Sequence, residues 1–538
     1  MGGYPTDRDL YTSVSLTAGE PATLNVLKEF AEFWKVPYGI GSRLEGEQVL
    51  VSAGISHHLT GSQEHPTIMI PSGSEDCRAI CRNYNLQLVE EEEAIRLPIA
   101  PETFTKLKAI VRRFIGPDLT PLLTSDGLPI LSRIQGTQSY VLSIDIIREY
   151  SRLIQTGFED PASTKFRIVS SLPLPYSVVP QSIRNWSLRR AYSQTTQDEG
   201  RIGSVDSLRI IFLASIVLAS KGRIPRISFR RQGKKYAMSV THDVETKHGL
   251  EEGSRYILEV ERRLGLRSTW NLPSDRYLIS QESLLLLTAA GDVGAHDTRH
   301  DGRLVLASPE EMLERVSSCK EKLAANGKTS VLGFRSPLLQ HSNQLLVAIR
   351  KAGYVYDSSV PSYEPLSPTS FRPHGIGTVF PMELDGLVEV PVSLPQDHQL
   401  VKIQGLTPRA AVGRLLEVSK WVARIGGVCV ILVHPDYEFG TPEYQPEYEK
   451  LLSEFRNDPE CDIMTLKEIA HWWRKRSSAH VEISDGLPRI SSDGDGSEVE
   501  DLQLEALIGY DKNGFKTQLI DEGTKHLSAG QRNAVRIE

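Results

Sequence analysis

Two carboxylates separated by a single residue stand at the end of a strand-like run. The segment 236–241 has strand-forming residues, and Asp243 and Glu245 follow it. On an extended strand, residues i and i+2 face the same side, so both side chains can point into one pocket. Two negative charges that close raise the pKa of one carboxyl unless a cation lies beside them. The pair predicts one metal-binding carboxylate next to one free base; the alternative is an exposed acidic strand end.

A second pair of residues suited to metal binding, His296 and His300, follows another strand-like run at 293–296. Histidines four positions apart lie on one face of a helical turn and can both reach one ion. Surface histidines also occur at this spacing, so the interpretation depends on the two carboxylates. Two imidazoles and one carboxylate leave coordination positions open for water and substrate, as a catalytic zinc site requires.

Three further polar residues end later strand-like runs. Arg335 could clamp a carboxylate through its guanidinium group, Asp357 supplies another acid, and His434 follows a wholly apolar run. Each residue alone has an ordinary structural explanation, as a surface salt bridge, a helix cap or a buried, hydrogen-bonded histidine. Polar groups at five strand ends favour a shared site.

The elements that must position these residues lie between about residues 229 and 476. Strand-like runs alternate there with amphipathic helical stretches, such as 281–290, which ends at Gly291, and a helix that starts at Ser308. About seven or eight such units indicate parallel strands with crossover helices. A closed barrel is favoured over an open sheet because polar residues recur at the carboxyl ends of several strands.

The rest of the chain carries no chemical motif. Residues 1–228 form a predicted α+β N-terminal region of unknown role that includes a linker at about 160–205. Its predicted strands are at 48–51, 66–70 and 140–143, and its predicted helices are at 101–115, 144–153 and 210–219. Residues 477–538 are either a polar acidic tail or a small β appendage.

Composition excludes several classes of protein. The 538-residue chain has a formal net charge of −7, so it lacks the basic field of a nucleic-acid-binding protein. Five cysteines do not make a disulfide framework and favour a reducing compartment. The N-terminus does not have the pattern of a signal peptide, and the longest apolar run is too short to span a bilayer. We therefore expect a cytoplasmic protein without a transmembrane segment; the oligomeric state stays open.

The ordered set of strand-end residues resembles the polysaccharide deacetylase family, the NodB-homology domain of carbohydrate esterase family 4. The resemblance covers about residues 229–476 and departs from the family's first motif, T-F-D-D, because Val244 occupies the second Asp position and Glu245 follows it, a D-V-E variant. The histidines of the second motif, H-[ST]-x-x-H, correspond to His296 and His300, and the third motif, R-x-P, corresponds to Arg335-Ser336-Pro337. The fourth motif, an Asp, corresponds to Asp357, and the fifth, a His after a strand, corresponds to His434.

The resemblance implies a distorted (β/α)7 barrel and metal-dependent hydrolysis of an N-acyl group. It implies a divalent metal, preferably zinc, held by Glu245, His296 and His300. In the catalytic set it implies Asp243 as general base, Arg335 as the residue that holds it, His434 as general acid and Asp357 as the residue that orients His434. Leu338 stands where the family usually has a Tyr whose backbone N–H contributes to the oxyanion hole. Pro337 and Leu338 are predicted to bind substrate. Asp397 belongs to a segment, 392–398, that also follows a strand end, and this segment either contributes to the substrate pocket or is a surface loop.

The predicted protein is therefore an enzyme, a hydrolase that acts on a non-peptide carbon–nitrogen bond and removes an N-acyl group, most simply acetyl, from an amino-sugar-containing saccharide or glycoconjugate. The absence of a secretion signal favours an intracellular saccharide, such as a nucleotide- or lipid-linked sugar. Two alternatives stay open: a hydrolase of a small non-sugar amide, and an inactive barrel that binds glycans.

Overall fold

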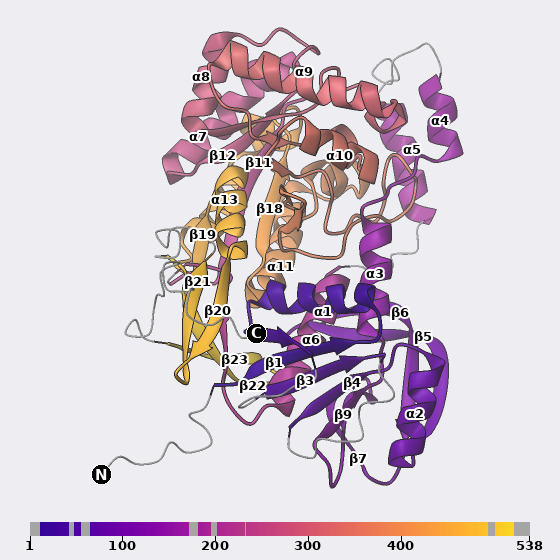
Figure 1. Cartoon of the computed structure of the whole chain (residues 1–538). Coiled ribbons are helices and arrows are strands. Elements are labelled where there is room, and N and C mark those ends of the chain that lie inside the picture. Colours follow the sequence, from indigo (N-terminus) through magenta and orange to yellow (C-terminus); the bar gives the residue numbers. More distant parts are fainter. Residues whose placement is uncertain are drawn as a thin grey trace. The chain divides into compact units, whose positions relative to one another are not determined.

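The computed structural model describes residues 11–41, 48–54, 65–171, 181–194, 202–231, 233–492 and 501–520. The chain has a mixed α/β fold (Figure 1). It divides into two compact units. The first contains Met1–Leu153, Ser204–Gln232 and Lys475–Glu538, and the second contains Ile154–Gly203 and Gly233–Arg474. Residues 154–203, which the sequence analysis assigned to the N-terminal region and its linker, therefore belong to the second unit.

The first unit contains a seven-stranded sheet with the order β2-β1-β3-β4-β9-β8-β7. Its strands are β1 (Ser13–Ala18), β2 (Tyr38–Ile40), β3 (Gln48–Ala53), β4 (Thr67–Ile70), β7 (Leu119–Ser125), β8 (Leu128–Ile134) and β9 (Ser139–Leu142). The helices are α1 (Pro21–Trp34), α2 (Ser74–Tyr84), α6 (Ser204–Ala219) and α3 (Ile146–Gly157), which runs across the boundary between the units. Strands β3, β4 and β9 confirm the predicted strands of this region.

Helix α6 is the predicted buried helix. It is apolar around most of its circumference, as expected of a helix enclosed by other elements, and nearly all of its residues are buried. It contacts both β3 and β4. Within the described residues, no helix is long and apolar enough to cross a bilayer.

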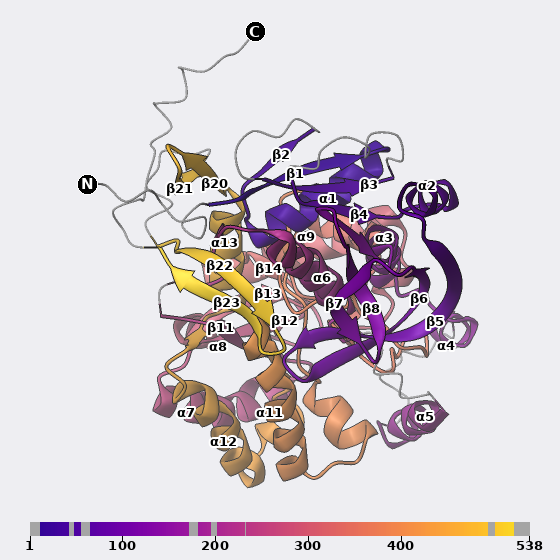
Figure 2. The ribbon, with the colours of Figure 1, turned by 90° about the horizontal axis from the view of Figure 1, so that it is seen from below.

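The predicted helix at 101–115 is wrong, because these residues form strand β6 (Thr103–Ile115), which pairs with β5 (Gln87–Ala100) in a long antiparallel hairpin (Figure 2). Its apolar residues also fit a helical spacing, but the buried positions alternate with a period of two, through Thr105, Leu107, Ala109 and Val111. The acidic residues of β5 face arginines on β6, as in the ion pair between Arg113 and Glu91.

The C-terminal segment contributes strands to the first unit. Strands β20 (Ala479–Ser484) and β21 (Leu487–Ser492) form one hairpin, whereas β22 (Leu504–Asp511) pairs with both β23 (Gly514–Leu519) and β10 (Ile224–Ile227). Of the two interpretations of 477–538, the described part of this segment is a small β appendage.

The second unit contains a nine-stranded sheet with the order β16-β17-β15-β14-β13-β12-β11-β18, and β19 also pairs with β11. Only β16 is antiparallel to its neighbour. The strands are β11 (Tyr236–Asp243), β12 (Ser268–Leu272), β13 (Gly291–Ala295), β14 (Gly333–Phe334), β15 (Tyr356–Asp357), β16 (Met382–Leu384), β17 (Leu387–Glu389), β18 (Val428–Val433) and β19 (Cys461–Ile463).

A closed barrel is not seen in this strand order, which ends at β16 and at β18. The segment after β17 nevertheless lies between β15 and β18. Val390 N donates to Asp357 O at 2.8 Å, and Leu394 N donates to Val430 O at 3.3 Å. The Ser393 hydroxyl also accepts from Val430 N at 2.8 Å. The carboxyl ends of these parallel strands therefore meet on one side of the sheet.

Six of the α-helices described in the second unit lie between its strands in the chain. They are α7 (Ser254–Leu264), α8 (Gln281–Ala290), α9 (Pro309–Gly327), α10 (Asn343–Lys351), α11 (Pro408–Ile425) and α12 (Gln445–Arg456). Helices α4 (Thr164–Ser171) and α5 (Gln181–Gln194) precede β11, and α13 (Leu466–Ser477) follows β19 and ends in the first unit. Helices α7, α12 and α11 lie side by side (Figure 2). The predicted caps are confirmed: Ser308 accepts from Glu311 N at the start of α9, and α8 ends at Gly291.

Candidate active site

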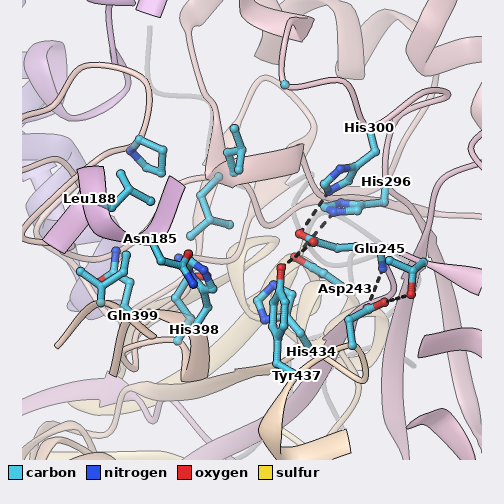
Figure 3. A pocket seen from close by; sticks show the side chains of 18 of the residues that line it. Asn185, Leu188, Asp243, Glu245, His296, His300, His398, Gln399, His434 and Tyr437 are labelled. Atoms are coloured by element: carbon cyan, nitrogen blue, oxygen red, sulfur yellow. Dashed lines mark hydrogen bonds and ion pairs between the residues drawn. The ribbon is translucent and has the colours of Figure 1, made fainter. Parts of the chain in front are cut away.

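A pocket of about 200 Å³ opens at the carboxyl ends of the parallel strands of the second unit (Figure 3). It joins most of the residues predicted to do chemistry with side chains from helix α5 and from the segment after β17. Its lining includes Asp243, Glu245, His296, His300, His434, Asp436, Tyr437, Arg276, Leu338, Leu339, Asn185, Leu188, Gln396, His398, Gln399 and Ile403.

Asp243 is held rigidly at the end of β11. Its Oδ1 accepts from Asn271 Nδ2 at 2.8 Å and from Arg335 Nη1 at 3.1 Å. Arg335 is itself fixed, because it donates to the Thr241 hydroxyl and to Ser358. Burial raises the pKa of Asp243, but Arg335, His296, His434 and the hydrogen bond from Asn271 together outweigh it, and the pKa lies below its ordinary value. The carboxylate is thus ionised at neutral pH and can accept a proton.

Glu245, the second carboxylate of the pair, lies next to His300 and Tyr437. Its Oε1 lies 3.3 Å from His300 Nε2, and its Oε2 accepts from the Tyr437 hydroxyl at 2.7 Å (Figure 3). Burial raises the pKa of Glu245, whereas the neighbouring His300 holds it well below the ordinary range. The two carboxylates therefore have different surroundings, as expected if they have different roles.

The histidines come together through a loop and not through the helical turn assumed from their spacing. His296 follows β13, and the backbone turns back through left-handed conformations at Asp297 (φ 64°) and His300 (φ 51°). The buried Asp297 carboxylate stabilises this loop, since it accepts from Arg315 Nε at 3.0 Å and from His300 N at 3.1 Å. The ring centroids of the histidines lie 4.8 Å apart.

Both imidazoles keep a nitrogen available for a ligand. The Nδ1 atom of His296 contacts Arg335 O at 2.8 Å, and that of His300 contacts Arg276. His296 Nε2 is buried without a hydrogen-bond partner, and His300 Nε2 is buried beside Glu245 Oε1 at 3.3 Å. Burial lowers the pKa of His296 to about 4, so this imidazole is neutral at neutral pH, the form that binds metals.

Carboxylate oxygens and buried imidazole nitrogens are ligands that suit a divalent metal, but these side chains are not arranged as a complete metal site. His296 Nε2 is 4.0 Å from Asp243 Oδ2, and Glu245 lies against His300 and Tyr437. Within the described residues, no group of three or more His, Cys, Asp and Glu side chains is arranged to hold a metal ion. The separation of 3.3 Å between Glu245 Oε1 and His300 Nε2 is itself compatible with two ligands on one tetrahedral ion.

His434 follows β18 and is paired with Asp397, not with Asp357 as predicted. Its Nδ1 lies 2.7 Å from Asp397 Oδ1, and its backbone N donates to Asp397 Oδ2 at 2.9 Å. Burial lowers the pKa of His434, but Asp397, Glu245 and Asp243 together raise it to about 10. The imidazole is therefore protonated at neutral pH and can donate a proton from Nε2.

Asp357 belongs to a separate buried network. It accepts from the Ser359 hydroxyl at 2.7 Å, and the same hydroxyl accepts from Ser336 N. Burial raises the pKa of Asp357 and, together with the charge of Asp357, raises that of the neighbouring Glu389 well above its usual range. This pair supports the backbone after β14 and does not contribute to the pocket lining.

The two other predicted substrate-binding positions differ in exposure to the pocket. Leu338 lines the pocket and has a left-handed backbone (φ 58°). Pro337 is buried next to it and begins the turn that carries Leu338. Asp397 positions His434 and is not part of the described lining.

Several residues of the site were not predicted from the sequence. Asn271 is the residue before the last of strand β12, so its place near a strand end was a usable signal. Asp436 and Tyr437 lie two and three residues after His434, and the Asp436 carboxylate accepts from Glu245 N at 2.8 Å. Helix α5 gave no signal, because its residues lie far from the motifs in the chain and carry no periodic pattern that points to a pocket.

Comparison with known proteins gives a limited result. No family model and no curated protein matches the sequence. A Mycobacterium smegmatis protein described as a polysaccharide deacetylase is 20% identical over 45% of this chain and 91% of its own, with a TM-score of 0.38. A family 4 carbohydrate esterase from Streptomyces lividans, solved with acetate, is 15% identical over 43% of this chain and 92% of its own, with a TM-score of 0.30.

A third solved structure is the Bacillus anthracis protein BA3943, described as a pseudoenzyme of the same esterase family. It is 13% identical over 44% of this chain and 66% of its own, with a TM-score of 0.31. Solved structures similar to part of this chain thus include both deacetylases and a pseudoenzyme, at low identity. At these values the similarity does not decide what the chain does, and the geometry of the pocket has to carry the functional argument.

Proposed function

We propose that the chain is a metal-dependent hydrolase of the polysaccharide deacetylase type, which removes an N-acyl group, most simply acetyl, from an amino-sugar-containing saccharide. The single observation that carries the proposal is the convergence, on one pocket, of a protonated imidazole, an ionised carboxylate and two imidazole nitrogens that face carboxylates. Amide hydrolysis needs these three functions: a proton donor, a proton acceptor and a site for an electrophile.

Each side chain has a role that follows from its surroundings. A divalent metal held by Glu245, His296 and His300 would polarise the amide carbonyl and make water more acidic. Asp243 is ionised and fixed by Arg335, so it can take the proton of the attacking water. His434 is protonated and can deliver its Nε2 proton to the nitrogen as the amine leaves. Arg335 and Asp397 act as positioning residues.

The experiment combines metal analysis with a substrate panel. We expect protein purified without chelators to contain one equivalent of zinc or a substitute such as cobalt, and the double variant His296→Ala/His300→Ala to lose it. The panel contains N-acetylated mono- and oligosaccharides, nucleotide-linked N-acetyl sugars and small non-sugar amides, and release of acetate or amine is measured.

The outcomes separate this function from its alternatives. Metal-free protein with full activity would contradict the metal assignment. Turnover of the non-sugar amides alone would favour the alternative hydrolase. Saccharide binding without turnover, at any metal content, would favour the glycan-binding barrel.

A further inference from the structure

The wall of the pocket opposite His296 and His300 carries three side-chain amides. Helix α5 contributes Asn185 and Leu188, and the segment after β17 contributes His398 and Gln399 (Figure 3). Gln396 of the same segment also lines the pocket. This wall is a defined part of the second unit, to which all of these residues belong. It lies outside the set of residues that performs the proposed chemistry.

Helix α5 is anchored to this wall. Leu188 packs in a buried cluster with Leu366 and Ile403, and Arg189 Nε donates to Lys402 O at 2.6 Å. Leu188 and Ile403 also line the pocket. These contacts hold Asn185, one turn before Leu188, at the pocket surface.

The two glutamine amides are oriented by the protein. Gln396 donates its Nε2 to Glu364 Oε1, and a carboxylate can only accept, so the amide orientation is fixed. Gln399 donates its Nε2 to Leu366 O at 3.3 Å. Each amide therefore keeps its carbonyl oxygen as an acceptor and a second N–H as a donor.

The charged residues of the lining also favour an uncharged ligand over an anionic one. Asp243, Glu245 and Asp436 are acidic, and Arg276 is already bound to the carbonyl oxygen and the Nδ1 of His300. A phosphate or diphosphate offers mainly acceptors and brings negative charge. Such a group would place its negative charge beside three carboxylates. A hydroxyl group carries no charge and can both donate to the glutamine oxygens and accept from their second N–H.

We propose that this wall, formed by α5 and the segment 396–403, is a subsite for an uncharged, hydroxyl-bearing part of the substrate, with Asn185, Gln396 and Gln399 as specificity-determining residues. The inference rests on the proposed function and narrows it. It argues against the nucleotide-linked sugars that the sequence analysis favoured, and it assigns a role to a helix that lies outside the motif-bearing region.

The test measures binding separately from turnover. Isothermal titration calorimetry is performed on the full-length Asp243→Asn variant, with an N-acetylated amino-sugar disaccharide and with the same N-acetyl sugar carried on uridine diphosphate. We expect the disaccharide to bind at least tenfold more tightly. Replacing Asn185 with Leu, which has a similar volume, should weaken disaccharide binding about tenfold, as for loss of one or two hydrogen bonds. Ser187→Ala, on the exposed side of the same helix, is the control and should bind like its parent.

Steady-state kinetics gives a second readout in the otherwise unmodified chain. Asn185→Leu should raise KM for the disaccharide about tenfold and leave kcat within about twofold, because the lost contact is equal in the ground and transition states. Circular dichroism checks that both helix variants fold.

Three results would overturn the subsite. They are equal or tighter binding of the nucleotide sugar, binding of neither ligand, and an Asn185→Leu variant that behaves like Ser187→Ala. Efficient deacetylation of the nucleotide sugar would refute the subsite while leaving the proposed function intact. Binding of the disaccharide without any turnover would refute the proposed function while leaving the subsite intact.

Discussion

Replacing Asp397 with Asn should lower the pKa of His434 and, with it, the upper pH limit of activity. The two side chains are 2.7 Å apart and both buried. A pair of unit charges with centres about 4 Å apart interacts by about 4 kcal/mol at an effective dielectric constant of 20. At ~1.4 kcal/mol per pH unit this corresponds to about three pH units. Asp397 is the first of the three carboxylates that, against burial, raise the pKa of His434 to about 10.

The assay is the pH dependence of kcat/KM, which reports the ionisations of the free enzyme. His434 acts as the acid and must be protonated, so activity is lost as the pH rises through its pKa. Removal of the Asp397 charge disfavours the imidazolium, and the alkaline limb should therefore move down by two pH units or more. Asn keeps the shape of the side chain and can still accept from His434 N.

Asp357→Asn is the matched control, because Asp357 is equally buried and also follows a strand but lies beside Ser359 and Glu389. Its alkaline limb should match that of the unmodified chain. Equal shifts in the two variants, or none in Asp397→Asn, would refute the assignment of Asp397 as the partner that sets the protonation of His434.

Three further predictions follow from the same geometry. Asp243→Asn should retain the metal and lower kcat by about 10²–10⁴-fold, as for loss of a general base, whereas Glu245→Gln should weaken metal affinity; elemental analysis beside kinetics would reveal reversed roles. Asp297→Ala leaves Arg315 buried without its main partner and should lower the free energy of unfolding by about 3–5 kcal/mol, measured by urea denaturation. Of the five free cysteines only Cys81 is not fully buried, so a thiol reagent should modify one thiol in the native chain and five after unfolding; rapid modification of several native thiols would contradict the described packing.

Much of the second unit could be predicted because its local patterns agree with its tertiary structure. The runs 236–241 and 428–433 have the composition of buried strands, and both are completely buried. The hairpin of β5 and β6 could not be predicted in this way. Phe104 fits the helical spacing of its neighbours, yet it is 40% exposed, while Thr105 is 2% exposed. Pairing with β5 decided the conformation, and no local pattern reports a partner strand.

The residues of the site also divide into those that could be predicted from the sequence and those that could not. Polar residues directly after strands were found by type and place, as with His434 and Arg335. What the sequence did not reveal was the contribution of elements without chemistry of their own. Helix α5 reaches the pocket only because Leu188 packs on residues more than 170 positions away. Such a contact depends on the fold of the whole unit and leaves no trace in local spacing.

The choice between Asp357 and Asp397 shows how strand order could have corrected the residue-level prediction. In a parallel sheet with successive crossovers, strands that follow each other in the chain tend to lie side by side. The strand-like segment before β18 ends at Leu394, and Leu394 N does pair with Val430 O. Counting forward from that pair, Asp397 is three residues beyond Leu394 and His434 four beyond Val430, so the two must meet. Asp357 ends β15, which pairs with β14 and β17 and not with β18. The carboxylate that pairs with His434 therefore comes from the segment beside β18, which carries Asp397. The order of the motifs along the chain, taken alone, selects Asp357 instead.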